Sequence, residues 1–118
     1  MTSSYRLTPK ARDGFRRIVS YVEERFGLEV ADSVIGQLEK SFEQLAANPG
    51  IGHRREDLTQ DGRVLFWSVG PTLMAYRLHP DWVEILFVER GDLDWERMLT
   101  RHLEGFNRGE GLRRTSVD

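Results

Sequence analysis

Arginine and tryptophan side chains occur where the second half of the chain alternates between apolar stretches and turns. Arg63, Arg77 and Arg90 stand at or near the ends of three predicted strands, and Trp67 lies on the strand that begins at Arg63. Side chains at alternate positions of a strand point to the same face. Arg63 and Trp67 could therefore hold the phosphate and the base of a single-stranded nucleic acid. The alternative is that Trp67 packs in the core beneath a helix, and we favour packing.

The tripeptide Arg90-Gly91-Asp92 matches a cell-adhesion motif by its letters alone. Such a short match recurs by chance in many chains. Gly91 permits the turn out of a strand, while Asp92 and Asp94 place negative charge at a helix N-terminus, where the helix dipole favours it. We therefore interpret the segment as a joint between two structural elements.

The histidines and paired carboxylates do not form a known metal-binding or catalytic pattern. His53, His79 and His102 have no partner at the spacing of a zinc-binding helix, and the chain has neither a cysteine nor a Gly-Lys-Ser/Thr phosphate loop. Adjacent carboxylates such as Glu23 and Glu24 would be solvated on an exposed surface, which leaves their chemistry ordinary. We predict no metal and no cofactor.

Two amphipathic helices are predicted in the first half of the chain. Thr8-Pro9 is typical of a helix start, because threonine caps exposed amides and proline loses no hydrogen bond at the first helical position. Apolar residues then recur with three- and four-residue spacing up to Phe26, and again after Gly27. Gly27 can take the left-handed conformation that ends a helix. Because the connection is short, we expect an antiparallel helix pair that stops at Asn48-Pro49-Gly50.

Strands are predicted in the second half, after a polar loop at residues 51–62. They are residues 63–69, 72–79 and 82–90, joined by short hairpin turns, with a further short strand at residues 5–7. The last strand is almost continuously apolar, as expected of a central strand covered on both faces. The helix pair would be one cover, and the sequence does not identify the other. A third helix should begin after Asp94, which would cap it.

Size and composition indicate one soluble domain. The chain has 118 residues, of which 39% are hydrophobic and 31% charged, with a net charge of -2. No apolar run approaches the ~18 residues that cross a bilayer, and the N-terminus lacks the apolar stretch of a signal peptide, so we expect a cytoplasmic protein. The 17 basic residues are almost all arginine, which suits a charged macromolecular partner but also follows from a genome rich in G and C. Residues 1–106 would form the domain and residues 107–118 a flexible C-terminal tail.

The order of these elements resembles the RelE/ParE toxin superfamily of bacterial toxin–antitoxin systems, and the ParE branch (plasmid stabilisation proteins) in particular. The similarity is carried by "YRLTPKARDGFRRIVSYVEERFG", "LEKSFEQLAANPGIGHRREDL", "WSVGPTLMAYR" and "VERGDLDWERML". It implies an α+β fold in which a small antiparallel sheet packs against an N-terminal helical hairpin and is followed by a short C-terminal helix. It also implies a toxin that a ParD-like antitoxin neutralises within a hetero-oligomer. The implied target is DNA gyrase.

The RelE branch implies a different activity, ribosome-dependent cleavage of messenger RNA by basic residues and an aromatic hydroxyl. At the corresponding places this chain has Gly70-Pro71-Thr72-Leu73, then Asp92-Leu93, and finally Leu99. These departures remove catalytic chemistry, so we favour a toxin without enzymatic activity. The ribonuclease and a degenerate, non-toxic binding module remain alternatives. The candidate partner-binding residues are Arg63, Trp67, Arg77, Arg90, Trp95 and Arg97.

Overall fold

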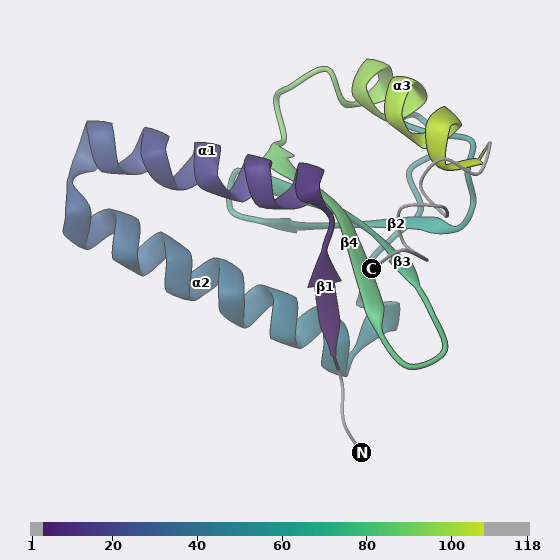
Figure 1. Cartoon of the computed structure of the whole chain (residues 1–118), viewed down its shortest axis with the longest axis horizontal. Coiled ribbons are helices and arrows are strands. Elements are labelled where there is room, and N and C mark those ends of the chain that lie inside the picture. The colour runs from purple at the N-terminus through teal and green to yellow at the C-terminus, as the bar shows by residue number, and fades with distance from the viewer. Residues whose placement is uncertain (1–3, 108–118) are drawn as a thin grey trace.

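The computed structural model describes residues 4–107, which form a four-stranded sheet between two helical layers (Figure 1). A helical hairpin covers one face of the sheet, and a C-terminal helix lies on the other. The elements in chain order are β1 (Tyr5–Leu7), α1 (Pro9–Phe26), α2 (Leu28–Ala47), the 3-10 turn η1 (Pro49–Ile51), β2 (Val64–Val69), β3 (Thr72–Leu78), β4 (Val83–Arg90) and α3 (Trp95–Asn107).

The helical hairpin forms as the sequence predicts. The Thr8 side chain accepts a hydrogen bond from the Ala11 amide at 3.1 Å, and Pro9 is the first helical residue. Gly27 has φ of 95°, a left-handed value that favours glycine, and it links α1 directly to α2. The two helices run antiparallel, and their tip projects beyond the sheet (Figure 1). For this reason Phe26 and Leu28, which belong to the predicted apolar patterns, are each 63% exposed.

The strand order is β1-β4-β3-β2, so the last strand of the chain lies inside the sheet. The β2–β3 and β3–β4 pairs are antiparallel, which confirms the predicted hairpins. The short strand β1 adds to β4 in parallel, with Tyr5 opposite Val83, and this makes the sheet mixed. Three predicted bounds shift slightly: Arg63 precedes β2, His79 follows β3, and Trp82 precedes β4.

A bulge in β4 explains its almost unbroken apolar sequence. Ala75 pairs with Phe87 and Tyr76 with Ile85, which leaves Leu86 as the extra residue. As a result Leu86 and Phe87, although consecutive, both pack on the face away from the hairpin, whereas Ile85 packs on the hairpin face.

The second cover of the sheet, which the sequence leaves unidentified, is α3. Trp95 and Leu99 are 2% and 0% exposed and pack with Phe66 and Phe87. The Trp95 ring meets the rings of Phe66 and Phe87 edge to face, at centroid distances of 6.1 and 6.2 Å. Asp94 caps α3 as predicted, since its carboxylate accepts a hydrogen bond from the Arg97 amide at 3.2 Å. Except for Asn107, the predicted tail at residues 107–118 lies outside the described residues.

The free edge of β4 beyond β1 is closed by the start of α1. The Thr8 amide donates to the Ile85 carbonyl at 3.0 Å, and the Thr8 hydroxyl donates to the Leu86 carbonyl at 2.7 Å. Six residues later, a Cβ built on Gly14 would lie 2.0 Å from the Val88 carbonyl oxygen. Only glycine lets the helix approach the strand so closely, because a Cβ–oxygen contact that short is sterically forbidden.

Candidate partner-binding surfaces

The structure places the six predicted partner-binding residues in different environments. Arg63 lies in the turn before β2 and holds Asp61, with its Nε donating to one carboxylate oxygen at 3.0 Å and a terminal nitrogen to the other at 2.9 Å. This hydrogen-bonded pair lowers the pKa of Asp61, and Arg77 lowers it further by its charge. Arg63 therefore holds Asp61 directly, whereas Arg77 acts on that carboxylate only through its charge and makes its hydrogen bond to Glu84.

Trp67 packs against the helical hairpin. It is half-buried and belongs with Leu65 and Val69 to the residues of β2 that contact the hairpin-side core. Its cross-strand partner is Met74, which is 0% exposed. Trp67 therefore packs on the hairpin side of the sheet, and its role in partner binding stays a prediction.

Arg77 belongs to a group that we call the Glu84 cluster: Arg6, Arg77, His79, Trp82 and Glu84. Glu84 is 6% exposed and stands between Arg6 of β1 and Arg77 of β3 in the strand register. A terminal nitrogen of Arg77 and Nε2 of His79 lie 3.1 and 2.9 Å from the same oxygen of Glu84. The His79 ring stacks on Trp82 at 4.1 Å, and the Arg6 guanidinium lies 4.8 Å from the Trp82 ring centroid.

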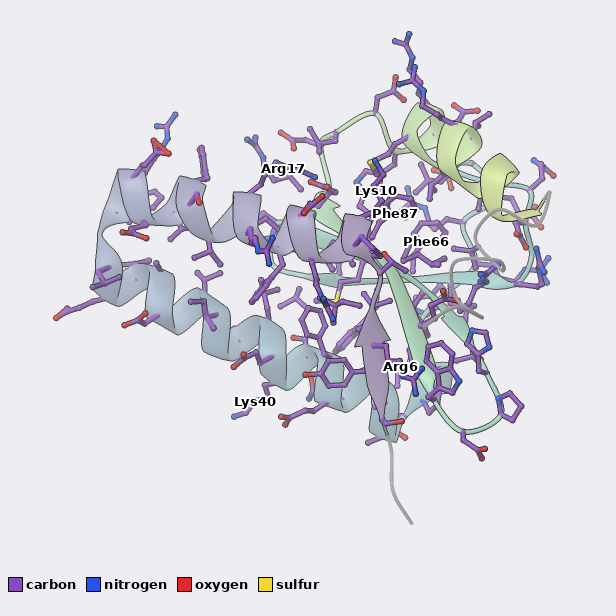
Figure 2. All side chains as sticks on the ribbon, in the orientation of Figure 1. Arg6, Lys10, Arg17, Lys40, Phe66 and Phe87 are labelled. Atoms are coloured by element: carbon purple, nitrogen blue, oxygen red, sulfur yellow. The ribbon has the colours of Figure 1, made fainter. Side chains whose placement is uncertain are left out.

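The Glu84 cluster neutralises a carboxylate that the fold has buried. A buried charge is tolerated only when it is paired and hydrogen-bonded, and Arg77 and His79 satisfy that requirement within the β3–β4 hairpin. Arg6, labelled beside β1 in Figure 2, lies at the edge of the cluster and keeps an exposed side chain. We assign the buried part of this cluster to fold stability.

Arg90 belongs to a second group, the Tyr21 cluster: Arg17, Tyr21 and Arg25 of α1 with Arg90 of β4. The guanidinium carbons of Arg25 and Arg90 lie 5.0 and 5.4 Å from the centroid of the Tyr21 ring. Arg17 forms an ion pair with Glu89, whose side chain is 7% exposed. Figure 2 labels Arg17 on the side of α1 that faces the β4–α3 connection. Sequence reasoning missed this cluster, although the spacing 17, 21, 25 places its α1 members on one ridge of a helix.

Trp95 and Arg97, the two candidates on α3, differ in accessibility. Trp95 is buried, and its indole N–H donates to the carbonyl oxygen of Arg90 at 2.8 Å. This bond fixes the start of α3 against the end of β4, so the ring is a packing group and we leave it out of the proposed surface. Arg97 is exposed on α3.

The joint Arg90-Gly91-Asp92 is a turn, as its sequence indicates. The Gly91 amide donates to the Pro71 carbonyl at 2.8 Å, and Arg90 reaches the Asp92 carboxylate at 2.7 Å. Among the side chains that the structure describes, residues 4–101, no three potential metal-ligating groups gather into a site. The same part of the chain contains no helix of the length and apolarity that crossing a membrane requires.

Comparison with known proteins identifies the family. The family described as "ParE toxin of type II toxin-antitoxin system, parDE" matches residues 5–95. The chain belongs to the ParE toxin family. This match spans β1 through the first residue of α3, so it includes the hairpin, the whole sheet and the joint. The resemblance to the ParE branch is thereby confirmed.

Two relatives of this ParE-family chain are both named Toxin ParE1. It is 33% identical over 81 residues to Toxin ParE1 of Caulobacter vibrioides, an alignment that covers 63% of this chain and 84% of the relative. It is 30% identical over 78 residues to Toxin ParE1 of Mycobacterium tuberculosis, covering 66% of this chain and 78% of the relative.

Two solved structures share the ParE fold. The chromosomal ParDE toxin–antitoxin system from P. aeruginosa superposes with a TM-score of 0.62 at 21% identity, covering 75% of this chain and 95% of that one. The toxin–antitoxin complex RelBE2 from Mycobacterium tuberculosis gives a TM-score of 0.53 at 20% identity, covering 76% and 99%. The α+β fold expected from the sequence is therefore confirmed.

Proposed function

We propose that this ParE-family toxin inhibits DNA gyrase by binding it and is neutralised by a cognate ParD-like antitoxin in a hetero-oligomer. The observation that carries the proposal is the family match over residues 5–95. The two similar solved structures are both toxin–antitoxin systems, which supports an antitoxin as a partner of this chain.

Exposed apolar side chains at the tip of the hairpin support a neutralising partner. Phe26 and Leu28 are each 63% exposed and Val30 is 43% exposed, and they lie at or next to the α1–α2 junction. Exposed apolar side chains that gather in one region mark protein interaction sites in soluble proteins. We therefore expect the free toxin to be less soluble than its complex with the antitoxin.

The positions at which the RelE branch carries catalytic groups support action by binding. Cleavage of RNA requires a group that activates the 2'-hydroxyl and groups that stabilise the developing charge. Here Thr72 and Leu99 are 6% and 0% exposed, and Leu99 has no polar group to offer. Asp92 is exposed, and its negative charge would repel a phosphate.

The proposal is tested by inducing the chain in bacteria and by assaying the purified protein against gyrase. We expect growth arrest, loss of supercoiling by purified gyrase and intact messages. Co-expression of the open reading frame that adjoins the toxin gene should restore growth. A Leu99→Asp variant, which places a charge in the core, should unfold and provides the inactive control. Cleaved messages with normal supercoiling would contradict the proposal and favour the ribonuclease, while normal growth would favour a non-toxic module.

A further inference from the structure

The Tyr21 cluster presents arginines on an exposed surface that is assembled from two distant parts of the chain. Arg17, Tyr21 and Arg25 come from α1, and Arg90 from the end of β4. The Tyr21 side chain is 40% exposed and both stacked guanidiniums lie on it. Tyrosine and arginine are the residue types enriched among the few side chains that dominate protein–protein binding.

The arginines of this cluster keep binding capacity after their internal contacts are counted. Among the described residues, Arg25 has no ion pair, and the Tyr21 hydroxyl forms no hydrogen bond. Within the described part of the chain, Arg90 forms an ion pair only with Asp92, and both side chains are exposed, at 49% and 64%. An exposed pair of that kind contributes little and can exchange its partner. Arg17 is oriented by the buried Glu89 carboxylate, which holds its guanidinium in place.

The spacing of the α1 residues defines the shape of the partner. Positions 17, 21 and 25 are four residues apart, which corresponds to about 6 Å per step along a helix axis. A second helix lying along this ridge, with carboxylates three or four residues apart, repeats that distance. Arginine binds carboxylates through a planar fork of donors.

The charge distribution favours an acidic protein segment over a nucleic acid. The whole chain has a net charge of -2, so it offers no long-range attraction to a polyphosphate. Glu89 and Asp92 also stand beside the arginines and would repel a continuous run of phosphates. A short helix that carries two or three separate carboxylates can place each carboxylate against one arginine.

We infer that the Tyr21 cluster is the docking point for an acidic helical segment of the protein partner. This inference rests on the proposed function, in which that partner is the antitoxin. The cluster would act as a small group of dominant contacts within a larger interface, because a stable complex buries about 800 Å² on each side.

The test measures the Kd between toxin variants and the protein encoded by the adjoining open reading frame, immobilised for biolayer interferometry. Tyr21→Ala should weaken binding about tenfold, which is about 1.4 kcal/mol. Arg25→Ala and Arg90→Ala should each weaken it about fivefold, a loss typical of residues at the edge of such a cluster. Arg17 is not substituted, since its loss would leave Glu89 buried without its partner.

Arg16→Ala is the matched control. Arg16 is on α1 with a side chain 76% exposed, so the variant removes the same charge from another face of the helix. Its Kd should change less than twofold. A complex that forms but is equally tight in all four variants would overturn the inference and leave the proposed function standing. Absence of any complex would overturn both. Binding of a 20-nucleotide RNA that depends on Tyr21 and Arg25 would also overturn it, because the surface would then be a nucleic-acid site.

Discussion

Replacing Gly14 with alanine would force α1 away from the edge of β4. The added Cβ would lie 2.0 Å from the Val88 carbonyl oxygen and 2.7 Å from a Glu89 carboxylate oxygen. Since ordinary non-bonded contacts begin at about 3.5 Å, the helix must retreat by about 1.5 Å. The Glu89 carboxylate can rotate away, but the Val88 carbonyl belongs to the backbone of β4, so rotation of a side chain cannot relieve the shorter contact.

Three terms determine how far Gly14→Ala lowers the free energy of unfolding. Overpacking of a filled interface costs about 1 to 3 kcal/mol. The two hydrogen bonds from Thr8 to β4 lie six residues away and would lengthen, at about 1 kcal/mol each. Alanine returns about 1 kcal/mol through its higher helix propensity. We expect Gly14→Ala to lower the free energy of unfolding by about 3 kcal/mol, a large part of the 5 to 15 kcal/mol typical of a domain.

The measurement is urea unfolding followed by circular dichroism at low micromolar protein concentration. Gly36→Ala is the matched control, because Gly36 lies in α2 and an added Cβ there has no atom within 4 Å. That variant should gain up to about 1 kcal/mol from helix propensity alone. If Gly14→Ala proves as stable as Gly36→Ala, the close approach of α1 to β4 is refuted.

Two further substitutions test buried polar groups. Tyr76→Phe removes a hydroxyl that donates to the Pro49 carbonyl at 2.7 Å and accepts from the Gly52 amide at 2.9 Å, so urea unfolding should show a loss of about 1 to 3 kcal/mol. Burial raises the pKa of Tyr76 above its ordinary 10.0, so above pH 10 the unfolded chain loses this proton more readily than the folded one. The free energy of unfolding of the wild type should therefore fall as pH rises above 10, and it should fall less steeply in Tyr76→Phe. Equal slopes of unfolding free energy against pH would contradict this. Arg77→Met should lower the free energy of unfolding by about 3 kcal/mol, because it leaves the buried Glu84 carboxylate without one partner. Adding Glu84→Gln to Arg77→Met should restore most of that loss. A double variant as unstable as Arg77→Met would count against the ion pair as the cause.

Local sequence patterns were sufficient to predict the helices and hairpins. Thr8, Gly27 and Asp94 mark helix ends by their own chemistry, and each is found in the predicted role. The turn at Gly70 likewise follows from a residue type, since its φ is 56°. Such features depend only on neighbours in the chain, so spacing and residue type are enough to find them.

Contacts between distant segments could not be predicted in this way. The parallel pairing of β1 with β4 joins residues 78 positions apart, and no local pattern encodes it. The bulge at Leu86 is hidden within an apolar run, and the cover provided by α3 is a contact between separate elements that no local pattern encodes. Gly14 did carry a signal, because an isolated glycine inside a helical pattern often marks a close approach.

The candidate surface was harder to predict than the fold. Of the six candidate residues, Arg90 lies in the Tyr21 cluster and Trp95 lies in the core. The polar ridge of Arg17, Tyr21 and Arg25 has the pattern of any solvated helix face. It becomes distinctive only in the folded protein, where β4 places the Arg90 guanidinium over the Tyr21 ring.

The position of β4 also determines how much of the chain must be synthesised before the proposed activity can arise. The ribosome synthesises β1 first, yet β1 pairs only with β4, the last strand to be translated and an interior member of the sheet. Until Val83–Arg90 has left the exit tunnel, β1 lacks its neighbour and α1 lacks the edge on which Gly14 and Thr8 rest. Contacts between such distant segments form late in folding. Nascent chains interrupted before β4 should therefore lack the proposed activity, which requires nearly complete translation.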